Sequence, residues 1–298
     1  MSDLRGEIAA LGAALIWAVA SFIYVGLGKW MPPLVLNFTK STIAIGFILL
    51  TLLLRGDTSL EMPPLSVGLL FFSGVIGIGF GDTAFFACLN AVGARRALLF
   101  EALSPPLAAL LAFATLDEQL GWQAWIGILL TLSGVAWVIV ERTPDDVQSQ
   151  RSPFWGICFG LLAALGQASG AVLSRAALAE VSASPLWSSL IRLSAGTLIL
   201  LLCLISRRES WKAFQPLCSR RFLGILTLTS FAGAYLAIWL QQTALKFTAT
   251  GIAQALTSTS PLFVIPLAIW AGDRVTMRAF CGVLIALAGI WLLFGLNQ

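Results

Sequence analysis

The chain contains no histidine, and charged residues make up only 11% of its 298 residues. The lack of histidine excludes zinc motifs built on histidine, Ser-His-Asp catalytic triads and histidine proton relays. Hydrophobic residues account for 58% of the chain. In a soluble domain about a quarter of the residues are charged, so this chain has too little polar surface for water. A lipid bilayer is its expected solvent.

Catalytic and metal-binding motifs are also missing. The five cysteines are scattered and form no CxxC pair, so they indicate neither a disulfide framework nor a metal site. Gly166–Gly170 does not fit the GxSxG elbow of hydrolases. We therefore expect no enzyme activity, no cofactor and no bound metal. The net charge of +4 comes mostly from Lys and Arg in loops. Basic loops are typical of a membrane protein, in which they set the orientation, so no nucleic-acid partner is expected.

Apolar runs of spanning length fill nearly the whole chain, since a membrane helix needs about 20 mostly apolar residues. We expect helices near 7–25, 34–54, 65–88, 94–115, 121–140, 154–178, 186–206, 221–245, 249–271 and 278–296. The predicted fold class is therefore an all-α integral membrane protein with ten transmembrane helices.

The second half of the chain repeats the first. Pro33-Leu34, Lys40 and Arg55 match Pro185-Leu186, Arg192 and Arg207, with residue numbers that differ by 152. Further along, Pro106, Glu118, Gly127 and Gly134 match Pro261, Asp273, Gly282 and Gly289, with a difference of 155. We expect one five-helix repeat over 1–142 and a second over 151–298.

An odd number of helices in each repeat predicts that the two repeats lie in the membrane with opposite orientation. Inverted repeats are typical of secondary transporters, in which two halves rock around a site near the middle of the bilayer. Lys and Arg gather in the loops after the odd-numbered helices, which by the positive-inside rule puts both termini outside the cytoplasm.

Ordered motifs across both halves resemble the drug/metabolite transporter superfamily, in particular its ten-helix branch built from two EamA domains. The first half carries Gly81-Asp82, Leu89-Asn90, Gly93-Ala94, Pro105-Pro106, Leu116-Asp117-Glu118 and Gly127. The second half carries Ala244-Leu245-Lys246, Thr248, Ala249, Ala253, Leu256, Ser258, Pro261, Asp273-Arg274-Val275-Thr276, Gly282 and Gly289. The resemblance covers almost the full chain.

The resemblance implies a secondary transporter, an exporter of small metabolites such as amino acids or toxic analogues, working by alternating access. Proton coupling is one option, and an uncoupled facilitator or exchanger of anionic metabolites is the alternative. The expected partners are a small-molecule substrate and the lipid of the cell (inner) membrane, and the chain is a monomer or a homodimer. Members of this family usually have cytoplasmic termini, against the charge pattern, so the orientation stays open.

Charged residues inside membrane helices are the first candidates for a site, because each costs about 2.5–3.5 kcal/mol on insertion scales. Lys40, Asp82 and Glu101 are expected in one layer of the first half, with Lys40 paired to one of the two acids. The other acid would then bind a proton or a cationic group. Arg192 occupies the position that matches Lys40. A structural alternative is that both basic side chains reach to the membrane interface.

No acid in the second half matches Asp82 or Glu101, so we expect a chemically asymmetric site. The matching positions fall near Ile238 or Trp239 and near Leu256 or Thr257. Aromatic and amide side chains could supply the remaining substrate contacts, with an interfacial belt as the alternative for tryptophan. These candidates are Trp17, Gln167, Tyr235, Trp239, Gln254 and Thr257.

Prolines within predicted helices break backbone hydrogen bonds and are candidate hinges. They are Pro105, Pro106, Pro261 and Pro266; a static kink is the alternative. Small residues recur at the same spacing in the fifth and tenth helices and permit close packing, within one chain or between two. Arg175 is expected to reach to the interface, and Glu118 to start a helix.

Overall fold

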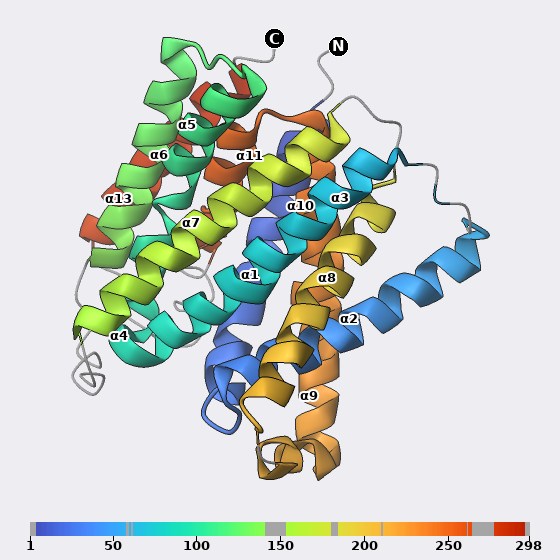
Figure 1. Cartoon of the computed structure of the whole chain (residues 1–298). Coiled ribbons are helices and arrows are strands. Elements are labelled where there is room, and N and C mark those ends of the chain that lie inside the picture. The colour runs from blue at the N-terminus through green and yellow to red at the C-terminus, as the bar shows by residue number, and fades with distance from the viewer. Residues whose placement is uncertain are drawn as a thin grey trace.

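Over the residues described, the computed structural model of the chain is a bundle of helices without strands. These residues are 4–57, 60, 62–140, 153–179, 184–209, 211–260, 262–263 and 277–295. α1 (Arg5–Leu27) begins and α13 (Met277–Gly295) ends at the same end of the bundle (Figure 1).

The described part of the first half consists of six α-helices and one π-helical segment. They are α1 (Arg5–Leu27), α2 (Pro33–Arg55), α3 (Pro64–Ser73), the π-helix η1 (Gly74–Asp82), α4 (Thr83–Glu101), α5 (Ser104–Leu116) and α6 (Trp122–Val140). Proline stands in the first turn of α2, α3 and α5, where its missing N–H has no intrahelical partner to lose. Gly56 ends α2 with a left-handed φ of 66°.

The second half also contains α-helices and a π-helix, together with a 3-10 helix. They are α7 (Pro153–Leu178), α8 (Pro185–Ser206), the 3-10 helix η3 (Trp211–Cys218), α9 (Arg220–Ser230), the π-helix η4 (Phe231–Leu236), α10 (Ala237–Phe247), α11 (Thr250–Thr257) and α13 (Met277–Gly295). Helices α9, η4 and α10 run on without a break, as do α3, η1 and α4.

Within the described residues, five helical segments are long and apolar enough to cross a membrane. They are Pro33–Arg55, Pro64–Leu89, Phe154–Leu178, Pro185–Ser206 and Arg220–Phe247. Shorter apolar helices cover Ser104–Leu116, Trp122–Trp137 and Cys281–Leu292. Large apolar side chains such as Leu54, 79% exposed, and Trp291, 77% exposed, point outward. An apolar outer surface is what a bilayer requires, so the chain is an integral membrane protein; ten spans stay a prediction.

The predicted boundary between the third and fourth helices is wrong. The helix that begins at Pro64 continues through 89–93 to Glu101, and α5 begins at Ser104. Pro105 and Pro106 explain the break, because neither donates a backbone hydrogen bond and each ring crowds the preceding turn. The two prolines therefore start a new helix instead of kinking a continuous one.

The two π-helical segments occupy matching places in the repeats. η1 precedes α4, and η4 precedes α10, and in each segment a side chain from another helix reaches a backbone carbonyl. Asn37 Nδ2 donates to the Ile78 carbonyl at 2.9 Å, and Trp17 Nε1 donates to the Gly233 carbonyl at 2.9 Å. Single π-helical turns are rare and frequent at functional sites.

Glycine permits a close helix contact between η1 and α7. A Cβ added at Gly166 would lie 2.9 Å from Gly81 Cα, and one added at Gly170 would lie 3.1 Å from Gly77 Cα. Glycines spaced four apart on both helices therefore bring the backbones together. This contact joins the first half of the chain to the second.

The small residues of α6 and α13 pack against each other within the chain. Gly134 faces Gly282 and Ala286, and Gly289 faces Gly127 and Thr131, so closely that an added Cβ would clash. The structure thereby decides between the two packing modes that the spacing allowed.

Candidate functional site

A cavity of about 150 Å³ lies between the two halves. One buried water needs roughly 10–15 Å³, so the cavity has room for a small molecule. Helices α1, α2, α4, α5, α7, α8, α10 and α11 contribute to it, together with η1 and η4. Its lining includes eight of the site residues predicted from the sequence: Trp17, Lys40, Asp82, Glu101, Gln167, Arg192, Gln254 and Thr257.

Lys40 and Asp82 form an ion pair at one side of the cavity. Lys40 Nζ lies 2.7 Å from Asp82 Oδ2, and their side chains are 9% and 17% exposed. The ammonium group also lies 5.8 Å and 5.0 Å from the ring centroids of Tyr24 and Phe86, within the range of a cation–π interaction. The structure thus pairs Lys40 with one of the two acids considered. The Lys40 side chain lies inside the bundle, against the acid and the two aromatic rings.

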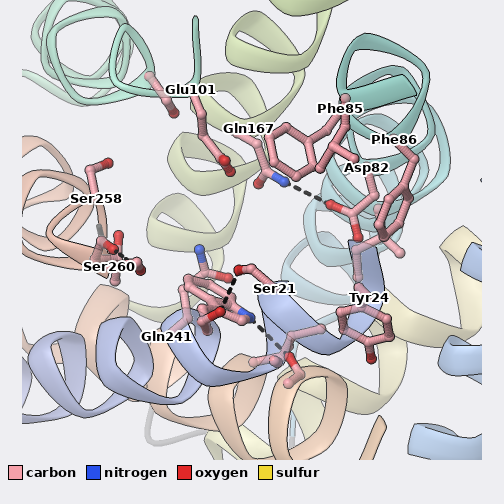
Figure 2. Close-up of a pocket in the computed structure, with 18 of the residues that line it drawn as sticks. Ser21, Tyr24, Asp82, Phe85, Phe86, Glu101, Gln167, Gln241, Ser258 and Ser260 are labelled. Carbon is pink, nitrogen blue, oxygen red and sulfur yellow. Dashed lines mark hydrogen bonds between the residues drawn. The ribbon is translucent and has the colours of Figure 1, made fainter. Parts of the chain in front are cut away.

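Asp82 connects this pair to the second half of the chain. Its Oδ1 accepts a hydrogen bond of 2.7 Å from Gln167 Nε2 on α7 (Figure 2). Gln254 Nε2 on α11 donates to the Gln167 carbonyl at 3.4 Å, and Thr257 Oγ1 lies 3.2 Å from Gln254 Oε1. Five predicted site residues therefore belong to one polar network across the interface between the halves.

Glu101 is placed at the last residue of α4, beside the break before α5. Figure 2 shows its carboxylate pointing into the open centre of the cavity. No hydrogen bond or ion pair joins it to another residue of the described chain. A carboxylate in this position is available to a proton or to a cationic group of a ligand.

Arg192 on α8 is 2% exposed and lines the same cavity. Its Nε and Nη1 have no hydrogen-bond partner among the residues the structure describes. Nη2 lies beside Gly77, where an added Cβ would be 3.1 Å away. An unpaired guanidinium in the interior is costly, so this group is the strongest anion-binding candidate in the cavity.

Two predicted site residues, Tyr235 and Trp239, are absent from the lining of this cavity. The Tyr235 hydroxyl lies 2.8 Å from Thr51 Oγ1, and the Arg55 guanidinium lies 5.2 Å from the centroid of the Trp239 ring. A regular helical period does not describe this segment, because the π-helix η4 changes the angle between successive side chains. Ile238 lines the cavity instead.

Sequence reasoning missed several cavity residues. They are Ser21, Tyr24, Phe85, Phe86, Gln241, Ser258 and Ser260. Ser21 and Tyr24 stand four and seven residues after Trp17, on the same face of α1, so the choice of Trp17 could have led to them. No comparable signal marks the two phenylalanines, which resemble any lipid-facing side chain until the fold is known.

A second ion pair closes one end of the interface between the halves. Arg175 Nε lies 2.7 Å from Glu118 Oε1, and Glu118 Oε2 accepts a hydrogen bond from the Thr250 amide at 3.0 Å. Arg175 Nη1 also donates to the carbonyls of Leu245 and Lys246. Arg175 and Glu118 thus each have an ionic partner in the other repeat. Glu118 also serves a helix start, as expected, but that of α11, because Thr250 is the first residue of this helix.

The predicted hinges are only partly described. Pro105 is buried and Pro106 half-buried at the start of α5, next to Ser104 in the cavity wall. Pro261 and Pro266 lie outside the described residues. A hinge role for Pro105 and Pro106 stays a prediction.

The comparisons with known proteins identify a family and a similar fold. The model of the EamA-like transporter family matches twice, at residues 4–140 and 154–295. A solved structure, described only as the crystal structure of a protein, shares 19% identity and a TM-score of 0.78, over 98% of this chain and 96% of that one. This similarity supports the fold alone. No curated protein matches the chain.

Proposed function

Because the chain belongs to the EamA-like transporter family of small-molecule membrane transporters, we propose that it is a secondary transporter that exports small metabolites. Amino acids and their toxic analogues are the proposed substrates. The proposed localisation is the cell (inner) membrane.

The cavity between the halves is the observation that carries this proposal. It holds four charged side chains in a membrane protein, and both halves of the chain contribute to them. Lys40, Asp82 and Glu101 come from the first half, and Arg192 from the second. A charged side chain inside a membrane helix costs free energy, and where such side chains occur they almost always face the interior of the bundle or a substrate or ion pathway.

Alternating access is the proposed mechanism, with the repeats 1–142 and 151–298 as two inverted units that rock against each other. The π-helices η1 and η4 and the break before α5 supply places where the backbone can bend. The Arg175–Glu118 pair joins the halves at one end of the interface. Opening that end requires this pair to separate, so it acts as a lock on one side of the cavity.

Glu101 is the proposed coupling group, since its carboxylate faces the cavity and the chain has no histidine. A proton that binds there and leaves on the other side would drive export. An uncoupled facilitator or exchanger of anionic metabolites is the second candidate, and the unpaired Arg192 favours it.

Export from cells that overproduce the chain tests the proposal, with a panel of amino acids, toxic analogues and cationic drugs. The wild-type chain should confer efflux or resistance, and Glu101→Gln should abolish it at equal expression. Glu209→Gln, after α8 and outside the cavity lining, is the matched control and should stay active. If Glu101→Gln exports as well as the control, Glu101 is not the coupling group. If wild type moves nothing on the panel, the proposed substrates are wrong.

The two candidate mechanisms separate in proteoliposomes with an imposed pH gradient. A proton-coupled exporter accumulates substrate against its own gradient only when the pH gradient is present. Flux that follows the substrate gradient alone, at the same rate with and without the pH gradient, would support the facilitator.

A further inference from the structure

Four charged side chains line the cavity within the described part of the chain, and only two of them are paired. Lys40 and Asp82 neutralise each other at 2.7 Å. Arg192 and Glu101 form no ion pair with each other or with another described residue. The cavity therefore presents one free positive and one free negative group from two different helices, α8 and α4.

The free guanidinium is built for an oxyanion. Its planar fork can bind both oxygens of a carboxylate, which a compact ammonium group cannot do with the same geometry. Arg192 is 2% exposed, and Gly77 leaves room for its head because a Cβ there would lie 3.1 Å from Nη2. The side chain is thus held in place while Nε and Nη1 stay without partners.

We propose that the cavity binds a zwitterionic α-amino acid, with its carboxylate on Arg192 and its ammonium group on Glu101. This inference rests on the proposed transport function, which already names amino acids as substrates, and adds the two subsites that hold the charged groups of the ligand. The remaining wall, which includes Trp17, Tyr24 and Phe86, offers aromatic surface to the ligand side chain.

Charge matching separates a zwitterion from the other small solutes. A cationic ligand at Glu101 would leave Arg192 buried without a partner, and an anionic ligand at Arg192 would leave Glu101 either unpaired or neutralised by a proton. A buried charge that loses its partner costs several kcal/mol. A zwitterion satisfies both groups and adds no net charge to a site inside the membrane.

Binding to the purified full-length chain in detergent tests the proposal, with two matched series of probes. One series is phenylalanine, phenethylamine and 3-phenylpropionate, and the other is alanine, ethylamine and propionate. The amino acid of at least one series should bind at least about 30-fold more tightly than both partners that lack one charged group. Equal binding of an amine and its amino acid would overturn the carboxylate subsite, and no binding by either amino acid would overturn the proposal.

The variants Arg192→Lys and Arg192→Gln should each weaken amino-acid binding by at least about 30-fold. Folding is checked by thermal unfolding without ligand, in which Arg192→Gln should be at least as stable as wild type because it removes an unpaired buried charge. Arg207→Gln, the exposed residue that follows α8, is the matched control and should bind normally. Unchanged affinity in Arg192→Gln would refute the anchor.

Failure of the subsites and failure of the transport function give different results. If amino acids bind as proposed but are not moved in proteoliposomes, the site stands and the transport function falls. If cells export cationic drugs while purified protein binds no amino acid, the transport function stands and the zwitterion site is wrong.

Discussion

Lys40 in the first half and Arg192 in the second occupy matching positions, but only Lys40 has an ionic partner among the described residues. Both are buried, at 8% and 2% exposure, and both line the cavity. Lys40 meets Asp82 at 2.7 Å, whereas the position that matches Asp82 in the second half falls at Ile238 or Trp239. In a repeated scaffold, one missing acid thus leaves an unpaired guanidinium where the other half has an ion pair.

The difference shows how a symmetric fold acquires a chemically asymmetric site. The π-helices, the carbonyls they expose to Asn37 and Trp17, and the glycine contacts belong to the scaffold. The charges that a ligand would meet depend on single side chains. Changing those side chains therefore tests the comparison without rebuilding the fold.

Restoring the missing acid should have the largest effect. Ile238→Asp places a carboxylate in the cavity wall that Arg192 also lines, so the guanidinium should pair with it as Lys40 pairs with Asp82. Amino-acid binding and export should fall at least about 30-fold, measured by ligand binding and by efflux at equal expression. Ile238→Asn is the control of similar shape without charge. Ile238→Asn should keep more binding and export than Ile238→Asp, and it should unfold at a lower temperature than Ile238→Asp. Equal loss of binding and export in the two variants would argue against charge pairing.

Removing the existing acid should have the next largest effect. Asp82→Asn leaves the buried Lys40 without its carboxylate and should destabilise the protein by about 3 kcal/mol, measured by denaturant unfolding in detergent. Arg192→Gln removes the matching charge of the second half and should not destabilise, since it breaks no pair. Similar destabilisation by both variants would contradict the contrast between the halves.

Moving Arg192 slightly should have the smallest effect. An alanine at Gly77 brings a Cβ to 3.1 Å from Nη2, so the guanidinium must shift by a few tenths of an ångström. Amino-acid affinity should fall about fivefold, equivalent to about 1 kcal/mol, in the same binding assay. Gly46→Ala, where an added Cβ meets nothing within 4 Å, should bind like wild type. Normal binding by Gly77→Ala would show that Gly77 does not position Arg192.

Prediction from sequence worked best where the pattern is carried by many residues. The apolar runs predicted the five long apolar helices found in the described chain, and the spacing of Gly127, Gly134, Gly282 and Gly289 predicted a close helix contact. Lipid selects apolar composition, and close packing requires small side chains. The predicted break between the third and fourth helices is wrong. Pro105 and Pro106 place it after Glu101, although the apolar run continues past this point. Rotation within helices was also misjudged, and Tyr235 and Trp239 were assigned to the cavity for that reason.

The sequence by itself determined the solvent, the family, the repeat and the set of charged residues available to a site. Tertiary structure alone decided which charges are satisfied. Asp82 lies with Lys40 and Gln167, and Glu118 lies with Arg175, whereas Arg192 Nε and Nη1 have no partner in the part of the chain that the structure describes. The physical reason is distance. In a low-dielectric interior a charge is neutralised only by a group within a few ångströms, and helices far apart in the chain supply that group.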